Sequence, residues 1–158
     1  MSAGKAVIMM GSKVDLDHAM KIVEWLDHYG IAYELRIASA HKTPEKVLEI
    51  LAEHENETGN IVYITIAGLS NALSGMVDFS TAHPVIACPP PCDSFGGADV
   101  YSSLRMPPGV APALILDPRN AALFVAKLFA LGDSGLRAQI RAQRAAQRAK
   151  IDEDEKTL

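Results

Sequence analysis

Two neighbouring side chains, His41 and Lys42, are suited to proton transfer and to phosphate binding. They stand in the segment SAHKTP, residues 39–44, at the start of a predicted helix. An imidazole takes up and releases a proton near neutral pH, and an ammonium group pairs with a phosphate. The segment equally fits a surface loop whose histidine has no function, so the local sequence leaves that alternative open.

A second candidate segment is GSKVD, residues 11–15, which could bind a phosphate. Gly11 and Ser12 stand at a predicted junction of a strand and a helix, where free backbone N–H groups attract anions. Asp15 could either cap the helix or bind a sugar hydroxyl. Such turns are often purely structural, and the segment matches neither the Walker pattern nor the dinucleotide-binding glycine pattern.

Two further loops are rich in small and polar residues. AGLSNALSGM, residues 67–76, has glycines on both sides of serine and asparagine, which suits a close approach of the backbone to a ligand or a neighbouring subunit. Residues 88–109 are rich in proline, glycine and serine, and long loops over the edge of a sheet are often functional. Both loops are therefore candidates for substrate contacts.

The two cysteines, Cys88 and Cys92, are predicted to be unpaired thiols in a reducing compartment. They flank three prolines in CPPPC, a longer spacing than that of C-x-x-C redox and zinc sites. No second pair of zinc ligands with a suitable spacing accompanies them. We therefore predict no bound metal.

The elements that must position these residues alternate between short β-branched runs and helical patterns, which predicts a parallel sheet. Strands are predicted at residues 6–10, 32–37, 61–67, 84–87 and 111–116. Helices are predicted at residues 15–29, from Thr43 as N-cap onward, and at 71–80, 99–105 and 120–131. The run at 61–67 is apolar nearly throughout, as expected for a middle strand covered on both faces. The predicted fold class is α/β, a three-layer αβα sandwich.

The four candidate segments each follow a predicted strand. In an open parallel sheet, ligands bind at the carboxyl ends of the strands, which meet at one edge. We therefore expect the four segments to form a single site.

The 158 residues suit one α/β domain, residues 1–132, followed by a C-terminal helical arm, residues 133–158. Four arginines of the arm recur every three or four residues and share one helix face. They are Arg137, Arg141, Arg144 and Arg148. No sheet is left for this helix to cover, so it is either exposed to solvent or packed on another subunit.

The formal net charge of −4 argues against a nucleic-acid partner, because nucleic-acid surfaces are normally basic. No apolar run approaches the roughly 20 residues of a transmembrane helix, and the N-terminus has no secretory signal. We expect a cytoplasmic protein with neither a membrane nor a nucleic-acid partner.

Four motifs, taken in order, resemble the PurE family of purine biosynthesis. They are GS..D after the first strand, SAHKTP after the second, AG.SNALSGM after the third, and DVYSSLRMP followed by NAALFVAKLFAL. The resemblance runs from about residue 6 to residue 131 and implies a flavodoxin-like fold. It also implies an enzyme that carboxylates aminoimidazole ribonucleotide (AIR) at C4 with CO2, giving carboxyaminoimidazole ribonucleotide (CAIR), without ATP or a cofactor. The implied assembly is a homo-oligomer, a tetramer or an octamer.

The motifs are similar to the second class of the family, the AIR carboxylases, rather than to the mutases of the first class. The mutases have GAAHLPGM and DSLLSIVQMP where this chain has NALSGM and DVYSSLRMP, and their loop histidine aligns with Ala72. Lys42 stands where the first class has an arginine. Val14 stands where the family commonly has a serine, so one phosphate contact is lost.

The resemblance implies a role for each segment. His41 moves the proton, Ser12 and Lys42 bind the phosphate, and Asp15 binds the ribose. The loop from Gly68 through Leu69 to Asn71 binds CO2, and two residues of the loop after the fourth strand close over the imidazole of the substrate. The implied substrate contacts are Gly11, Ser12, Asp15, Ser39, Ala40, Lys42, Gly68, Ser70, Asn71, Ser94 and Phe95, with Ser70 and Asn71 for CO2.

Two alternatives stay open. The first is a mutase that uses N5-carboxyaminoimidazole ribonucleotide, against which the missing loop histidine argues. The second is a non-catalytic module that binds a ribonucleotide or a flavin on a flavodoxin-like scaffold, because a fold alone does not fix a function.

Overall fold

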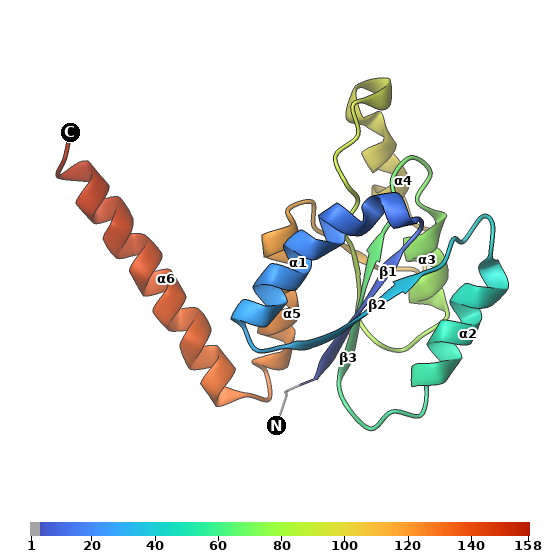
Figure 1. The fold of residues 1–158 in the computed structure, drawn as a ribbon, viewed down its shortest axis with the longest axis horizontal. Coiled ribbons are helices and arrows are strands. Elements are labelled where there is room, and N and C mark those ends of the chain that lie inside the picture. The colour runs from blue at the N-terminus through green and yellow to red at the C-terminus, as the bar shows by residue number, and fades with distance from the viewer. Residues whose placement is uncertain (1–3) are drawn as a thin grey trace.

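The computed structural model describes residues 4–158, and its centre is a parallel sheet of five strands (Figure 1). The strands are β1 (Lys5–Met10), β2 (Ala32–Ile37), β3 (Ile61–Ile66), β4 (Val85–Ala87) and β5 (Ala113–Leu114). Their order is β2-β1-β3-β4-β5, and every neighbouring pair is parallel. All six residues of β3 are buried, which confirms the prediction of an apolar middle strand.

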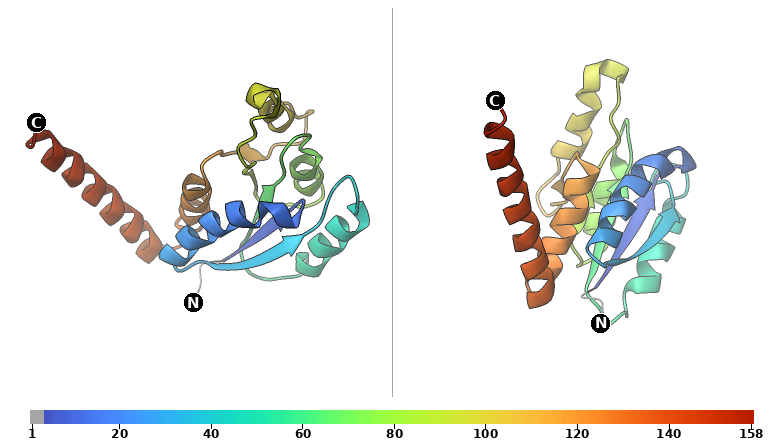
Figure 2. Two further views of the ribbon diagram at one scale, coloured as in Figure 1. Left: turned by 45° about the horizontal axis from the view of Figure 1, so that its top comes forward. Right: turned by 60° about the vertical axis from the view of Figure 1, so that its left-hand side comes forward.

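Helices cover both faces of the sheet (Figures 1 and 2). On one face lie α1 (Leu16–His28) and α5 (Pro118–Phe129), and on the other lie α2 (Pro44–His54) and α3 (Ala72–Phe79). Each face has its own apolar core, one built around Ile8 and Ile64 and the other around Met9 and Tyr63. These neighbouring residues alternate between the two cores because successive side chains of a strand point to opposite faces. The predicted three-layer α/β fold is confirmed.

The segment after β4 differs from its prediction. A short helix was expected at residues 99–105, but a 3-10 helix, η2 (Ser94–Val100), runs into α4 (Tyr101–Leu104) instead. Phe95, Gly96 and Gly97 have positive φ angles, which break the regular helix and were not visible as a pattern of apolar residues. The two helices form a projection, residues 94–104, that rises from the carboxyl edge of the sheet (Figure 1). We call these residues the projection below.

The last helix, α6 (Ser134–Glu155), is attached only by its first turns. The Asp133 carboxylate accepts a hydrogen bond from the Leu136 N–H at 2.9 Å, so Asp133 caps the start of this helix. Leu136 and Ile140 are buried in the core beside α1 and α5, whereas every residue after Gln143 is exposed. The remainder of α6 extends away from the body of the molecule (Figures 1 and 2). Within residues 4–158, no helix is long and apolar enough to cross a membrane.

Candidate active site

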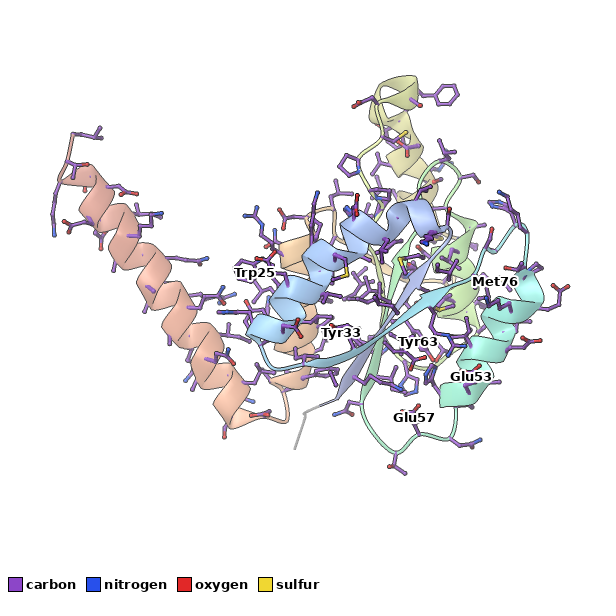
Figure 3. All side chains as sticks on the ribbon, in the orientation of Figure 1. Trp25, Tyr33, Glu53, Glu57, Tyr63 and Met76 are labelled. Carbon is purple, nitrogen blue, oxygen red and sulfur yellow. The ribbon has the colours of Figure 1, made fainter. Side chains whose placement is uncertain are left out.

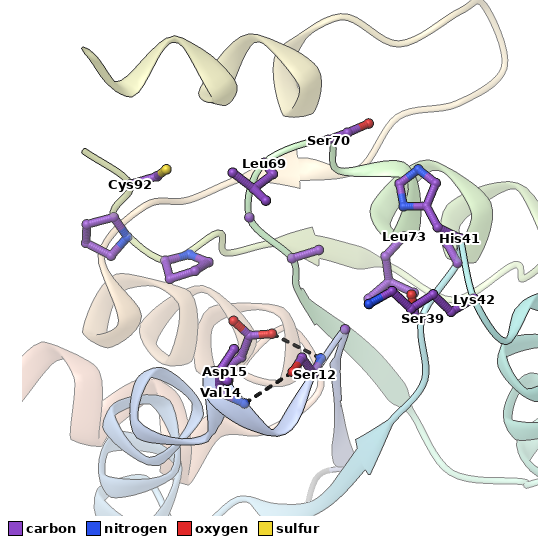
Figure 4. A pocket seen from close by; sticks show the side chains of 16 residues that line it. Ser12, Val14, Asp15, Ser39, His41, Lys42, Leu69, Ser70, Leu73 and Cys92 are labelled. Atoms are coloured by element: carbon purple, nitrogen blue, oxygen red, sulfur yellow. Dashed lines mark hydrogen bonds between the residues drawn. The ribbon is translucent and has the colours of Figure 1, made fainter. Parts of the chain in front are cut away.

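A pocket of about 470 Å³ opens where the loops after β1, β2, β3 and β4 meet (Figure 4). The structure therefore brings the four candidate segments together, as the edge of a parallel sheet requires. The predicted contacts that line the pocket are Gly11, Ser12, Asp15, Ser39, Ala40, His41, Lys42, Gly68 and Ser70. Asn71, Ser94 and Phe95 are not among the lining residues.

The loop after β1 is held by hydrogen bonds between its own residues. The Ser12 N–H donates to Asp15 Oδ2 at 3.1 Å, and the Val14 N–H donates to Ser12 Oγ at 3.4 Å (Figure 4). Together they form a capping box at the start of a 3-10 turn, η1 (Lys13–Asp15), that leads into α1. Partial burial raises the pKa of Asp15, although the Ser12 N–H works in the opposite direction. Val14 also lines the pocket and is 85% exposed, so an apolar side chain forms part of the pocket wall here.

The loop after β2 is closed by Thr43. Its hydroxyl accepts a hydrogen bond from the Ser39 N–H at 3.0 Å and lies 3.3 Å from the Ser39 carbonyl oxygen. Thr43 occupies the N-cap position of α2, as predicted, although its side chain makes no hydrogen bond to the helix. The hydroxyl closes the preceding turn instead. Within residues 4–158 the side chains of His41 and Lys42 make no hydrogen bond or ion pair, and both face the pocket from this loop (Figure 4).

The loop after β3 contains a strained residue. Leu69 has a φ angle of +59°, in the left-handed region, which costs a residue with a β-carbon roughly 1–2 kcal/mol. Its side chain lines the pocket and is 61% exposed. An apolar side chain in this conformation at a pocket wall must be held by its surroundings.

Asn71 has a structural task that the sequence alone did not reveal. It is 4% exposed, and its Oδ1 accepts hydrogen bonds from the Ser74 N–H at 3.1 Å and the Ser74 hydroxyl at 2.9 Å. Its Nδ2 donates to Ser103 Oγ at 2.8 Å. The side chain therefore caps α3 and is occupied on both sides. A direct contact of Asn71 with CO2 stays a prediction that this geometry does not favour.

The loop after β4 contributes Pro90, Pro91 and Cys92 to the pocket, which lie in the candidate loop 88–109 but were not predicted as individual contacts. Their place in the first residues after a strand was the available signal. Phe95 is 86% exposed on the projection, so closure of Ser94 and Phe95 over a substrate stays a prediction. Burial raises the pKa of the Cys88 thiol to about 12, which keeps it protonated and unreactive. No disulfide joins the two cysteines.

A cluster of charged side chains lies at the other end of the sheet. Glu34, Glu53 and His54 approach one another closely enough to hold a metal ion (Figure 3 labels Glu53). However, Arg36 bonds to Glu34 Oε1 at 2.7 Å and also to Glu53, and Lys5 lies 3.3 Å from Glu34 Oε2. The Arg36 guanidinium lowers the pKa of Glu34 to about 2. Because two cations already neutralise these carboxylates, we interpret the group as an ion-pair cluster and not as a metal site.

Comparisons with known proteins agree with one another. The AIR carboxylase family model matches residues 5–150. A phosphoribosylaminoimidazole carboxylase of Archaeoglobus fulgidus is 61% identical over 136 residues, which are 86% of this chain and 74% of that protein. One of Treponema denticola is 51% identical over 152 residues, 96% of each chain. A bifunctional mouse enzyme, phosphoribosylaminoimidazole carboxylase/phosphoribosylaminoimidazole succinocarboxamide synthetase, is 42% identical over 87% of this chain, which spans only 32% of that protein. The crystal structure of Treponema denticola PurE superposes with a TM-score of 0.95, at 50% identity and 98% coverage of both chains.

Proposed function

We propose a mechanism from the premise that the chain belongs to the AIR carboxylase family and is a phosphoribosylaminoimidazole carboxylase, a carboxy-lyase of purine biosynthesis. The sequence-based assignment to the PurE family is thereby confirmed. We propose further that the chain carboxylates AIR at C4 with CO2 to give CAIR, reversibly and without ATP. The observation that carries this proposal is the pocket in which one imidazole, one ammonium group, one carboxylate and a serine hydroxyl meet.

The bound substrate would be held from the loops after β1 and β2. Lys42 and Ser12 line the pocket from these two loops, and their cation and hydroxyl suit a phosphate. Asp15 keeps one carboxylate oxygen free of hydrogen bonds to the described residues, and this oxygen can accept a bond from a ribose hydroxyl. Val14 offers no hydroxyl, so the phosphate has one donor fewer on this side. Holding two reactants in one orientation can supply several kcal/mol of the acceleration.

The chemical step needs a nucleophilic carbon, CO2 and a base. C4 of AIR is enamine-like, and its attack on CO2 forms the carbon–carbon bond while one electron pair of CO2 moves onto oxygen. C4 then carries both the new carboxylate and its original proton. His41 takes that proton, and the electron pair of the C4–H bond restores the aromatic ring. A positioned general base of this kind contributes roughly 100- to 10,000-fold.

The choice between carboxylase and mutase rests on the imidazoles of the pocket. Among the described residues that line it, His41 is the only histidine. Ala72, the position of the second histidine in the mutases, is exposed at the start of α3. A single proton carrier suits direct carboxylation, which moves one proton from C4. We therefore favour the second class of the family.

The test is a spectrophotometric assay of CAIR decarboxylation without ATP, run beside an assay with N5-carboxyaminoimidazole ribonucleotide. Turnover of CAIR alone is expected. Faster turnover of the N5-carboxy compound would instead assign the mutase activity. The non-catalytic alternative is disfavoured by membership of an enzyme family, and a purified protein with bound yellow flavin would revive it.

A further inference from the structure

The projection is hydrogen-bonded to the strained loop that follows β3. The Leu69 N–H donates to Asp99 Oδ2 at 3.3 Å, and the Asn71 N–H donates to Ser102 Oγ at 3.0 Å. The single proton of the Ser102 hydroxyl is shared between the Leu69 carbonyl oxygen at 3.0 Å and the Asp99 carbonyl oxygen at 2.8 Å. Both backbone polar groups of Leu69 therefore bond to the projection, about thirty residues further along the chain.

These bonds fall where the backbone most needs support. Leu69 has the left-handed φ angle, and such a conformation in a residue other than glycine persists only where the surroundings over-determine it. Asp99 fixes the N–H group before the Leu69 α-carbon, and Ser102 fixes the carbonyl group after it. Without them the peptide groups on both sides of Leu69 could rotate toward a relaxed conformation.

The side chain that these bonds place is part of the pocket wall. Leu69 faces the pocket from the loop after β3, opposite the phosphate-binding candidates of the loop after β1 (Figure 4). CO2 is small and uncharged, so it depends on an apolar wall that excludes water more than on any single hydrogen bond. Neither Asp99 nor Ser102 lines the pocket.

We propose that Asp99 and Ser102 are positioning residues for the carboxylation: they hold Leu69 in its left-handed conformation so that its side chain forms the wall of the CO2 subsite. The inference rests on the proposed function. Neither residue touches the substrate, and both act through Leu69. The phosphate and ribose are held from other loops, so the loss of these bonds weakens the use of CO2 and spares AIR binding.

The experiment compares Ser102→Ala with Ser102→Thr, which keeps the hydroxyl, and with Tyr101→Phe. Tyr101 is the matched control, because it is exposed on the same helix and its hydroxyl bonds to no described residue. Ser102→Ala should lower kcat/KM for CO2 roughly 10- to 100-fold, the cost typical of a misplaced reacting group, with the KM for AIR within about twofold. Ser102→Thr should recover most of the loss, and Tyr101→Phe should match the parent.

A structural measurement accompanies the kinetics. Hydrogen exchange of the Asn71 amide should accelerate in Ser102→Ala, since this amide donates to the Ser102 hydroxyl directly. The Leu69 amide, which donates to Asp99, should follow because the Leu69 carbonyl also loses its Ser102 partner. If Ser102→Ala does not fold, Asp99→Ala is the second variant, because Asp99 is a half-buried residue of the projection. It should likewise lower kcat/KM for CO2 while leaving the KM for AIR nearly unchanged.

Two outcomes overturn the inference while the parent enzyme remains active. One is a Ser102→Ala variant whose constants for CO2 and AIR change equally, and the other is one that behaves like Tyr101→Phe. A parent that does not carboxylate AIR at all would refute the proposed function, and with it this role. The assay of the parent therefore separates the two failures.

Discussion

The side chains of His41 and Lys42 are free for a ligand because other groups close the turn that carries them. Backbone bonds from the Lys42 and Thr43 N–H groups to the Ser39 carbonyl, at 3.3 and 2.8 Å, join the Thr43 hydroxyl in fixing this turn. An imidazole and an ammonium group are thus placed at the pocket, and neither side chain bonds to another described residue. This arrangement gives substitutions of the two side chains different expected effects.

We expect His41→Asn to leave the fold and product binding nearly intact while it removes most of the carboxylase activity. Asparagine is close in size but cannot accept and return a proton near neutral pH, so the rate should fall roughly 100- to 10,000-fold. Titration with CAIR measures binding, and exchange of the C4 proton of AIR in D2O measures proton transfer. A variant that binds normally and turns over within about tenfold of the parent would show that another group moves the proton.

Lys42→Ala is the contrasting substitution. Its ammonium group would bind the phosphate equally in the ground state and the transition state, and such an interaction affects KM more than kcat. We expect a raised KM for AIR with a smaller change in turnover, measured in the same assay. A collapse of turnover at constant KM would contradict the phosphate assignment.

Residue types predicted the pocket better than they predicted hydrogen-bond partners. His41, Lys42, Ser12 and Asp15 were found because their chemistry and their positions after strands are both visible in the sequence. Asn71 was expected to contact CO2, yet its amide caps α3, since an asparagine before a helix serves either purpose equally well. The left-handed φ angle of Leu69 could not be predicted from the sequence, because glycine and asparagine, not leucine, are the residue types typical of that conformation.

Among the elements, the edge strand β2 is tied to α2 by the ion-pair cluster. Glu34 and Arg36 lie on β2, Glu53 and His54 lie on α2, and Arg36 bonds to both carboxylates. His54 is 2% exposed, and its Nε2 lies 3.1 Å from Glu34 Oε2. The helix α2 begins at Pro44, directly after the turn that carries His41. By holding α2 against β2, the cluster also helps to fix the position of that turn. The strands and helices followed from apolar periodicity, but this cross-element pairing did not.

We expect Glu34→Gln to lower the free energy of unfolding at pH 7 by about 1 kcal/mol, a modest value because the cluster is partly exposed to water. The folded-state pKa of Glu34 is lowered to about 2, chiefly by the hydrogen bond from Arg36. A depressed carboxyl pKa stabilises the fold above the unfolded value, roughly 4.3, and this stabilisation disappears as the pH falls toward 2. The difference between parent and variant should therefore be constant above about pH 5 and vanish on acidification.

Urea unfolding of both proteins between pH 7 and pH 3 measures this difference. Glu49→Gln is the matched control, because Glu49 is exposed on α2, the helix that carries Glu53 and His54, and makes no ion pair within residues 4–158. It should change stability little at any pH. An equal loss for Glu34→Gln at pH 7 and pH 3 would contradict the electrostatic explanation.

For the whole molecule, the sequence predicted a C-terminal helix with no sheet to cover, and the structure divides that helix into two parts. The first turns bury Leu136 and Ile140 in the core, and Gln143 Oε1 accepts a hydrogen bond from the Tyr29 hydroxyl at 2.6 Å. These contacts could not be read from sequence, since they depend on the space between α1 and α5. Beyond Gln143 the helix has no buried residue, and a solitary helix of this length is only marginally stable in water.

The exposed part of α6 also has an unfavourable charge at its end. Residues 152–155 are all acidic and lie at the C-terminus, where the helix dipole disfavours negative charge. The arginines that share one face of the same helix could neutralise these carboxylates in a second copy of the chain. We therefore expect a homo-oligomer, at least a tetramer, in which this part of α6 packs across a subunit boundary.

Deleting residues 148–158 tests the expected assembly, since this truncation leaves Leu136, Ile140 and Gln143 in place. Light scattering should report a smaller assembly than that of the parent, because the truncation removes exposed residues of α6 that are expected to pack across the subunit boundary. Ile140→Ala is the contrasting variant: it opens a cavity in the core and should destabilise the subunit by about 2–5 kcal/mol. A truncated protein with the mass and thermal stability of the parent would mean that α6 beyond Gln143 is a solvated helix, and that any oligomer forms through another surface.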